Sequence, residues 1–501
     1  MTPTVQQQAF LTALATTSSH LALIARAGCG KTSTILLGVA QEIQRNPRIE
    51  ILVCAYNKAI EVEMSGKLTQ AGHDWKAVQA KTAHALGFGL LKFIFKPQVD
   101  DKKVRKLVEA QNNDICQAYG PQITQLVAYA KQAGFGFFPD KAIGNVPAWH
   151  ALADHFDVNG LDDTTEADLV VEAAQRIYRL SLNQTDVVDF DDMILFPLVK
   201  NLRVKFTKDL IFVDEAQDLS QARQALIRKF LRPNTGRMVV VGDDRQSIYG
   251  FTGADAAALP NQIELLKAAE LPLSVTWRCP RAVVTEAQRY VSDIEAAPNA
   301  AEGSVTRVTD RETIDELMTS LGPTDAVLCR NTAPLISAAY KLIRAGKPCK
   351  VEGRAIGEGL TALVQRWKVR TIDAFMGRLE TYQEREVQKA MAKGNEAKME
   401  EVQDKCETLR EIAGACMAKG GTQVSDMVAF IDNLFADSAT GVTILATYHR
   451  SKGREWPRVI LWEHAQRCPS RAARQDWQRQ QEDNLAYVAI TRAQVQLIYV
   501  G

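Results

Sequence analysis

Residues 25–32 read Ala-Arg-Ala-Gly-Cys-Gly-Lys-Thr, and this stretch decides the fold. An apolar run at 21–24 leads into it and residues 33–37 open a helical pattern behind it, so the order is strand, glycine-rich turn, helix. Such a turn points backbone N–H groups at phosphate oxygens, and the helix N-terminus adds a partial positive charge. We therefore predict a phosphate-binding loop in which Lys31 contacts the β- and γ-phosphates of a nucleotide and Thr32 offers its hydroxyl to Mg²⁺.

Two acidic residues after another apolar strand supply the second half of such a site. Residues 210–213 are Leu-Ile-Phe-Val, and they run directly into Asp214 and Glu215. Adjacent carboxylates at the end of a buried strand are costly unless a cation neutralises them. We predict that Asp214 holds Mg²⁺ through its water shell and that Glu215 orients or deprotonates the attacking water.

Other predicted strands of this sheet also end in polar or aromatic residues. The strand at 51–55 is followed by residues 56–58, and a second short segment ends at residues 81–84. Because ligands bind beyond the carboxyl ends of strands in an open α/β sheet, both ends are candidate ligand contacts. The sheet pattern is expected to resume near residues 189–192.

A further strand at 238–241 gives way to the segment 242–251. Gln246 in this segment is well placed to sense the γ-phosphate. Tyr249 and Phe251, beside glycines at a strand end, could present rings on which bases stack, although either ring taken alone is more often part of a core.

Two stretches interrupt the sheet pattern. Residues 93–180 are mainly helical in pattern, and their basic cluster is either a solvated helix face or a contact to a nucleic-acid backbone. Residues 356–440 abandon a second α/β pattern that begins after 283, and 379–417 is predicted to form a helical hairpin broken at residues 394–395. This second stretch is either a solvated spacer or a contact to a duplex or a protein. The basic cluster comprises Lys102, Lys103, Arg105 and Lys106.

The bulk composition narrows the class of protein. A chain of 501 residues suggests two to four units. The net charge of +1 gives no overall attraction to nucleic acid, so any such binding must come from a local basic surface. Nine cysteines with no CxxC pair argue against zinc or iron–sulfur ligation and indicate reduced thiols. No signal peptide or run of membrane-spanning length is found, so we expect a cytoplasmic protein with no membrane partner.

With these segments in order, the chain resembles the UvrD/Rep/PcrA group of superfamily 1 DNA helicases over nearly its full length. The residues Tyr-Asn-Lys-Ala at 56–59 and Ser-Lys-Gly-Arg-Glu-Trp at 451–456 are also similar to the F-box DNA helicase branch and to phage-like forms. The resemblance implies an α/β fold with two RecA-like P-loop domains, 1A and 2A, that have parallel sheets, clamp ATP and each carry a mainly helical insertion. The implied parts are 1A at 1–92 and 181–282, insertion 1B at 93–180, 2A at 283–355 and 441–501, and a short insertion 2B at 356–440.

The resemblance also implies roles for individual residues. Trp277 would stack on adenine, Arg278 and Arg492 would reach the γ-phosphate from opposite sides, and Gln6 would read adenine, with Gln7 as a rival. The implied catalytic residues are Lys31, Asp214, Glu215, Gln246, Arg278 and Arg492, with Thr32 and Asp214 on the metal. The implied nucleotide contacts are Gln6, Ala27, Gly28, Cys29, Gly30, Lys31, Thr32, Ser33, Trp277 and, on the ribose, Glu455. The implied DNA contacts are Tyr56, Asn57, Lys58, Thr82, His84, Tyr249, Phe251, Arg330, Thr447, His449 and Lys452.

The expected function is that of an ATP- and Mg²⁺-dependent DNA helicase that moves along single-stranded DNA and acts at single-strand/duplex junctions. The resemblance implies 3′→5′ travel, which no residue fixes by itself. We expect a monomer, encoded by a bacterium or a phage, that works with a replication, repair or phage partner protein.

Three alternatives stay open: a single-strand translocase that strips proteins from DNA, a nucleotide-gated DNA-binding scaffold, and an unrelated P-loop ATPase acting on a small molecule. Departures from the family pattern bear on the first of these. Phe251-Thr252-Gly253 replaces a Trp-Arg-Gly sequence, Ala55 replaces a phenylalanine, and the second insertion has about half the usual length.

Overall fold

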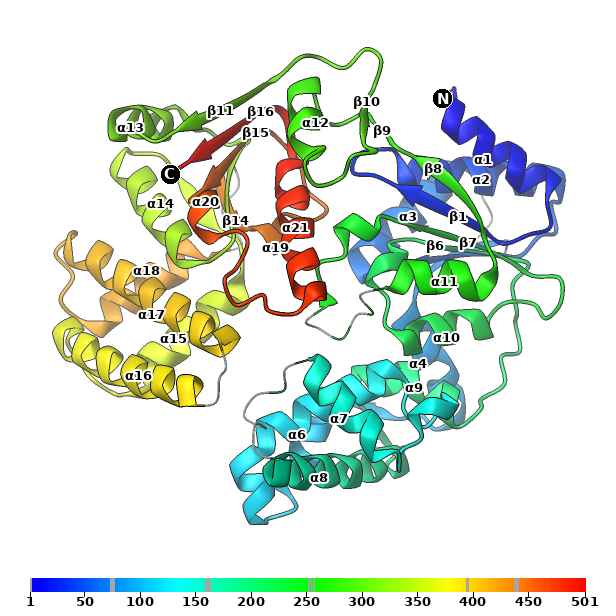
Figure 1. The fold of residues 1–501 in the computed structure, drawn as a ribbon, viewed down its shortest axis with the longest axis horizontal. Helices are drawn as coiled ribbons and strands as arrows, with labels where there is room; N and C mark the ends of the chain where they lie inside the picture. The colour runs from blue at the N-terminus through cyan, green and yellow to red at the C-terminus, as the bar shows by residue number, and fades with distance from the viewer. Residues whose placement is uncertain are drawn as a thin grey trace. The chain divides into compact units, whose positions relative to one another are not determined.

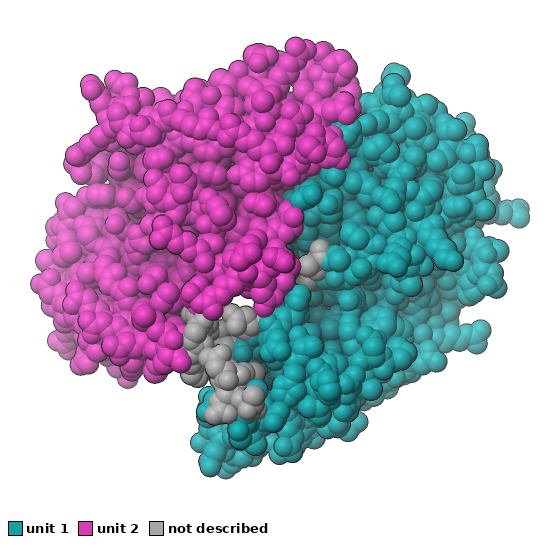
Figure 2. Space-filling view, in the orientation of Figure 1, with its two compact units in different colours: residues 1–274 teal, residues 275–501 magenta. Residues whose placement is uncertain are grey.

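Each half of the chain is built around a six-stranded sheet whose neighbouring strands are parallel (Figure 1). The structure divides into two units, residues 1–274 and 275–501 (Figure 2). The predicted α/β class with two parallel sheets is thus confirmed, and residues 275–282, expected at the close of the first sheet domain, belong to the second unit. The computed structural model describes residues 2–72, 77–156, 158, 164–250, 253, 255, 257–392, 396–436 and 441–501.

The sheet of the first unit is nearly all aliphatic at its centre. Its order is β3 (Val78–Thr82), β2 (Ile51–Ala55), β6 (Leu210–Val213), β7 (Arg237–Gly242), β1 (Leu21–Ala25) and β8 (Ala269–Leu273). Every residue of β2 and β6 is buried, because helices cover both faces of a parallel sheet. The close packing of helix on sheet depends on Gly38, where an added Cβ would lie 3.1 Å from the rings of Phe10 and Phe212. The covering helices are α1 (Val5–Thr16), α2 (Lys31–Arg45), α3 (Lys58–Gln70), α4 (Ala83–Ile94), α9 (Phe190–Val199), α10 (Gln221–Lys229) and α11 (Ala258–Leu266).

The carboxyl ends of the strands of the first unit all lie at one edge of its sheet, since the strands are parallel. The segments that leave this edge after β1, β2, β3, β6 and β7 are the ones that the sequence marked as candidate ligand contacts. The fold therefore gathers these segments at the place where open α/β sheets bind ligands.

The first insertion forms a helical layer with its own apolar core. Trp149 and Tyr178 are among its fully buried side chains, and Leu195 of α9 joins the same cluster. The insertion follows β4 (Gln98–Val99) and ends at β5 (Val187–Val188), which pair with each other in a separate two-stranded sheet. Its helices are α5 (Lys103–Glu109), α6 (Asp114–Ala133), α7 (Val146–His155) and α8 (Thr164–Asn183), with a short 3-10 turn at Pro139–Lys141.

The prediction that the sheet resumes near residues 189–192 is wrong, because these residues begin helix α9. Asp189 caps the helix and forms a capping box with Asp192. Both carboxylates are also paired with buried ammonium groups: Lys131 Nζ lies 2.6 Å from Asp189 and 2.7 Å from Asp192, and Lys103 Nζ lies 2.7 Å from Asp192. Acidic residues at a helix N-terminus are stabilised by the unpaired N–H groups there, and hence this acidic run favours a helix start.

The basic cluster of the first insertion is neither a uniformly solvated face nor an open anion-binding surface. Lys103 points into the protein and also donates to the Ser181 and Gln184 carbonyl oxygens. Lys106 pairs with Asp100 and Arg105 pairs with Glu109. Three of its four cations are therefore matched by carboxylates.

The second unit repeats the parallel-sheet plan. The strand order is β11 (Ser304–Val308), β16 (Ala493–Val500), β15 (Trp456–Trp462), β12 (Asp325–Cys329), β14 (Thr443–Thr447) and β13 (Cys349–Val351). A short pair, β9 (Val275–Thr276) and β10 (Glu295–Ala296), lies at its start. Its helices outside the insertion are α12 (Arg281–Ala287), α13 (Arg311–Ser320), α14 (Ala333–Arg344), α19 (Tyr448–Ser451), α20 (His464–Arg467) and α21 (Asp476–Ile490).

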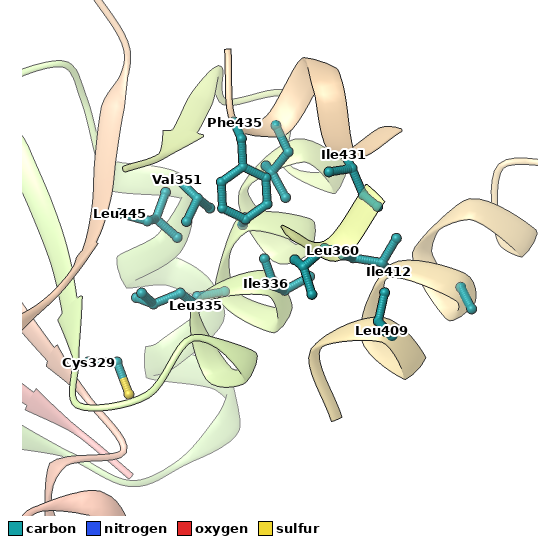
Figure 3. Close-up of a cluster of buried hydrophobic side chains, with 14 of the residues drawn as sticks. Cys329, Leu335, Ile336, Val351, Leu360, Leu409, Ile412, Ile431, Phe435 and Leu445 are labelled. Atoms are coloured by element: carbon teal, nitrogen blue, oxygen red, sulfur yellow. The ribbon is translucent and has the colours of Figure 1, made fainter. Parts of the chain in front are cut away.

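The second insertion shares one apolar core with the sheet of its unit. Figure 3 shows Leu409 and Ile412 of the insertion in the cluster that also holds Leu335 and Val351 of the sheet layer. The predicted helical hairpin is confirmed for the described residues, although it begins earlier than expected, at residue 372. Long as its two arms are, no helix in the described part of the chain has the length and apolar composition needed to cross a membrane. The insertion consists of α15 (Arg354–Arg366), α16 (Ile372–Ala392), α17 (Glu396–Met417) and α18 (Val424–Leu434).

Candidate functional site

The glycine-rich loop connects β1 to α2 and leaves the start of that helix open to an anion. Gly28 and Gly30 have φ of 72° and 84°, a left-handed conformation that favours glycine. Gly30 is the N-cap of α2 and offers no side-chain cap, so the first N–H groups of the helix lack the partner that a serine or aspartate would supply. The predicted nucleotide contacts Ala27, Gly28, Cys29, Gly30, Lys31, Thr32 and Ser33 all lie in this loop or in the first turn of α2.

A lysine and two carboxylates meet beside this loop. Lys31 Nζ lies 2.6 Å from Glu215 Oε1, and Asp214, buried at the end of β6, accepts a 3.0 Å hydrogen bond from the Glu215 N–H. Burial, followed by the charge of Glu215, raises the pKa of Asp214 to about 6. Burial disfavours the charged form of Lys31, but the charges of Glu215 and Asp214 outweigh it and raise the pKa of this lysine. Two adjacent carboxylates, of which Asp214 is buried, beside one ammonium group fit Mg²⁺, a hard cation that takes oxygen ligands.

The loop cysteine adds no reactive group. Cys29 is buried, and burial raises the pKa of its thiol to about 12. Because only the thiolate is a strong nucleophile or metal ligand, Cys29 fills space in the loop.

A chain of hydrogen bonds connects Glu215 to Gln246. The Gln217 amide donates to Glu215 and accepts a 3.1 Å bond from the Asp243 N–H. The Gln246 amide in turn donates to Asp243 Oδ2 at 2.8 Å. Gln246, predicted to sense the γ-phosphate, is thus brought into one network with Lys31 through Glu215.

Arg26 anchors this network from the phosphate loop. Its Nη1 lies 2.8 Å from Asp243 Oδ1 and 2.7 Å from Asp244 Oδ1, and the arginine is buried. The sequence reasoning missed Arg26, Gln217 and Asp243 as site residues. An arginine inside a glycine-rich loop and an Asp-Asp pair after a strand were the available signals.

The two candidate glutamines of α1 have different partners. Gln7 is buried, forms a capping box with Thr4 and donates to Thr34 Oγ1 at 3.0 Å. Gln6 is partly exposed, donates to Ser274 Oγ at 2.8 Å and accepts from the Ser274 N–H at 3.0 Å. Gln7 therefore stabilises the start of α1, while Gln6 is the more accessible of the two.

In the second unit the predicted arginines lie together. Arg278 pairs with Glu455 and its Nη1 donates to the Thr491 carbonyl oxygen at 3.4 Å. Arg492 is 1% exposed and donates to the carbonyl oxygens of Val488 and Arg454, at 2.8 and 3.1 Å. Among the described residues no carboxylate forms an ion pair with Arg492. Burial, and then the nearby charge of Arg278, lowers the pKa of Arg492 to about 9.

Trp277, the predicted adenine-stacking residue, precedes these arginines and is 54% exposed. It lies directly after β9. An exposed indole next to a strand end is free of core packing on much of its surface.

The predicted DNA contacts of the first unit lie at the carboxyl edge of its sheet. Tyr56 and Tyr249 stack with ring centroids 6.1 Å apart, and His84 meets Phe190 edge-on at 6.2 Å. Burial lowers the pKa of His84 to about 4. Asn57 and Thr82 cap α3 and α4, and Lys58 pairs with Glu61 at 2.8 Å. Phe251 lies outside the described residues.

The predicted DNA contacts of the second unit form one group. Arg330 contacts both carboxylate oxygens of Glu482, with its shortest bond at 2.7 Å. His449 is close enough to Arg330 and Lys452 that, after burial, their charges help lower its pKa to about 3. Thr447 is the N-cap of α19. Arg330 is thus occupied by an internal ion pair, a partner that sequence reasoning did not foresee.

These features define a P-loop nucleotide-binding protein, because the glycine-rich loop and the carboxylates of β6 lie at one edge of a parallel sheet. Residues 5–265 match the UvrD/REP helicase N-terminal domain and residues 361–500 match the UvrD-like helicase C-terminal domain. The chain belongs to the UvrD/REP helicase family.

Individual relatives are more distant. The chain is 26% identical over 263 residues to DNA helicase II of Salmonella typhimurium. This match covers 48% of this chain and 34% of the relative. The chain is 25% identical over 265 residues to ATP-dependent DNA helicase PcrA of Staphylococcus epidermidis, with the same 48% and 34% coverage. A shorter match, 34% over 96 residues, links it to ATP-dependent DNA helicase Rep of Escherichia coli and covers 18% and 14% of the two chains. The chain thus spans about a third of the length of the first of these relatives.

Proposed function

We propose that this protein is an ATP-dependent DNA helicase that moves 3′→5′ along single-stranded DNA and uses ATP and Mg²⁺ to separate duplex at single-strand junctions. The observation that carries the proposal is Lys31, 2.6 Å from Glu215 and beside the buried Asp214. The two family domains and the names of the relatives support a DNA helicase.

In the first unit we assign the chemistry by position. Lys31 and the N–H groups of the first turn of α2 bind phosphate oxygens, and Thr32 and Asp214 hold Mg²⁺, which supplies positive charge to the phosphates. Glu215 orients the attacking water and Gln246 responds to the γ-phosphate. Gln6 reads the adenine edge, since its amide can both donate and accept.

In the second unit we assign to Arg278 and Arg492 the role of stabilising the negative charge that develops on the γ-phosphate in the transition state. A buried guanidinium whose hydrogen-bond partners are two carbonyl oxygens and the uncharged Thr491 hydroxyl would be stabilised by a phosphate, and arginines in this role are worth about 10³–10⁵ in rate. Trp277 would stack on adenine and Glu455 would contact the ribose.

For the DNA we assign the residues at the two strand-end groups. Tyr56, Tyr249 and Phe251 would stack on bases, because base–ring stacking tolerates any sequence. The polar and basic contacts are Asn57, Lys58, Thr82, His84, Arg330, Thr447, His449 and Lys452. Glu482 holds the guanidinium of Arg330, so Arg330 would contact the strand from a fixed position.

The first test is the ATPase activity of Lys31→Ala and Glu215→Gln with and without single-stranded DNA. We expect both variants to lose DNA-stimulated hydrolysis by at least about 10²-fold. The controls are Arg354→Ala and Glu358→Gln, an exposed Arg–Glu pair on α15 with a 3.1 Å contact, and these should retain activity. Unchanged DNA-dependent function in the Lys31 and Glu215 variants would contradict the proposal and favour a scaffold.

The second test is strand separation on 3′-tailed and 5′-tailed duplexes with ATP and Mg²⁺. We expect separation of the 3′-tailed duplex alone. Strong DNA-stimulated ATPase with no separation of either duplex would instead identify a translocase that displaces proteins.

A further inference from the structure

An exposed aromatic and basic surface lies at the far end of α4, outside every residue assigned above. Phe93 and Phe206 are 72% and 75% exposed, and Ile94 is 48% exposed. Two segments meet there, because Lys205 Nζ lies 4.5 Å from the centroid of the Phe93 ring. We call residues 92–96 and 200–206 together the Phe93–Phe206 patch.

Core packing does not require the two exposed rings. The segment after α9 is already anchored by Leu202, which packs with Leu91 and Phe196 in one apolar cluster, and Phe95 fills the side of that cluster. Neither Phe93 nor Phe206 belongs to this cluster. Contiguous exposed apolar side chains on a soluble protein mark a binding surface more often than scattered ones do.

The charge of the patch is wholly positive. Its twelve residues include five cations and no acid, although the whole chain has a net charge of only +1. In the described part of the chain none of the five forms an ion pair. Cations beside exposed rings bind the phosphates and the unstacked bases of a single strand. The cations are Lys92, Lys96, Lys200, Arg203 and Lys205.

One exposed face of α4 connects the candidate DNA contacts at the start of this helix to the patch at its end. That helix begins beside Thr82 and His84, and its exposed residues Ala85, Gly89 and Phe93 recur at a spacing of four. At Gly89 an added Cβ would meet nothing within 4 Å, so this face is smooth and open. The rise from His84 to Phe93 is about 14 Å, which is the length of about four nucleotides in a B-form strand.

We propose that the Phe93–Phe206 patch is a second binding surface for single-stranded nucleic acid, which holds the strand after it leaves the carboxyl edge of the first sheet. Bases stack on Phe93 and Phe206 while the surrounding lysines and Arg203 neutralise phosphates. The biological role of this surface rests on the proposed helicase function, because the patch would hold the strand along which the helicase moves. Its existence as a binding site can be measured independently of ATP hydrolysis.

The decisive experiment compares the affinity of the full chain for short and long oligo-dT, of about 8 and about 25 nucleotides, by fluorescence anisotropy without nucleotide. We expect Phe93→Ala/Phe206→Ala to bind the long strand about tenfold more weakly and the short strand as the parent does. The matched control is Phe137→Ala, which removes a 40%-exposed ring elsewhere in the same unit and should change neither affinity.

A second variant removes charge rather than rings. Lys92→Gln/Arg203→Gln/Lys205→Gln should reduce the slope of log affinity against log salt by about 2 for the long strand, because each phosphate contact contributes about 0.7 on single strands. Arg48→Gln/Lys267→Gln, two exposed cations away from the patch, should leave the slope unchanged.

Three outcomes would overturn the proposal. One is long-strand binding that matches the parent in affinity and salt slope, which would leave an acidic protein segment as the occupant to consider. Another is an equal loss for short and long strands, which would assign the effect to the strand-end contacts. The last is a similar loss in the control variants. Failure of the proposed helicase function would give a different result. In that case DNA would not stimulate the ATPase of the parent chain, while the patch variants would still bind the long strand more weakly than the parent does.

Discussion

At the scale of single residues, Arg26 is the unexpected member of the nucleotide site. It lies in the phosphate loop, and its guanidinium donates to Asp243 and Asp244. Burial raises the pKa of Asp243, and the charge of Arg26 opposes that effect. Since Asp243 also accepts from Gln246, Arg26 acts as a positioning residue for the proposed γ-phosphate sensor.

Substitution of Arg26 should therefore lower turnover more than nucleotide affinity. We expect Arg26→Ala to reduce kcat of the DNA-stimulated ATPase between about 10- and 100-fold, because a small displacement of a catalytic group has that effect, with little change in the KM for ATP. Removal of one partner of a buried ion pair should also lower the free energy of unfolding by about 3 kcal/mol.

Arg26→Lys keeps the charge and should restore part of the turnover. Steady-state kinetics and urea unfolding measure the two effects separately. An increase in KM with unchanged kcat would show that Arg26 binds the nucleotide directly and would contradict a positioning role.

At the scale of elements, α17 is docked by an acidic stripe. Four carboxylates at spacings of four, four and three residues lie on one face of the helix, which is the spacing of side chains that share a face. Asp404 accepts from the Thr332 and Ala333 N–H groups at 3.2 and 3.0 Å and so caps the start of α14. The other three are Glu396, paired with Arg474, Glu400, bonded to Asn331 and Ser470, and Glu407, paired with Arg467. The second insertion is therefore held to its sheet by this face, rather than being a solvated spacer.

Loss of the Asp404 cap should destabilise the second unit. We expect Asp404→Ala to lower its free energy of unfolding by about 1–2 kcal/mol, the usual cost of removing an N-cap. Glu401→Gln is the matched control on the same helix, because Glu401 is exposed and pairs with Lys398 and Lys405, so its loss should cost less than about 0.5 kcal/mol. Urea unfolding followed by far-UV circular dichroism measures both. Equal effects of the two substitutions would show that Asp404 does not cap α14 in solution.

At the scale of the whole molecule, three partly buried histidines are kept neutral by the fold. Burial lowers the pKa of His84 and His464 to about 4 and that of His449 to about 3. For His464 the facing groups are Tyr448, with a 2.8 Å hydrogen bond to Nδ1, Tyr499, and the charges of Glu286 and Arg307. The unfolded chain binds a proton below about pH 6.5, and the native ring does so only below about pH 4.

Stability should therefore fall as the pH drops from about 6.5 to about 4 and should be independent of this group above pH 6.5. The linkage for a ring with these two pKa values gives a loss of about 2 kcal/mol at pH 5 relative to neutral pH. We expect the decrease in the free energy of unfolding between pH 7.5 and pH 5 to be about 2 kcal/mol smaller in His464→Gln than in the parent. Urea unfolding at the two pH values measures this difference. A variant with the same pH dependence as the parent would show that His464 titrates normally in the native state.

Much of the fold and of the nucleotide site could be predicted from the sequence, because short-range sequence patterns determine these features. Apolar runs that end near Lys31 or at Asp214 identify strands and the polar residues at their carboxyl ends, and the charged hairpin of α16 and α17 has helical spacing. The pairings of Arg330 with Glu482 and of Lys131 with Asp189 join residues far apart in the chain. No periodicity encodes such partners, so these residues could be placed on elements but not matched.

The core shown in Figure 3 has a consequence for how the second unit can vary. Leu409, Ile412 and Ile431 of the insertion lie in one apolar cluster with residues of α14 and β13. Excision of residues 354–436 would thus remove part of the cover of this cluster and leave apolar side chains such as Leu335 and Val351 more exposed to water. The insertion and the sheet should therefore unfold in a single cooperative step. A shortened insertion should keep the second unit stable only if it still covers this apolar cluster.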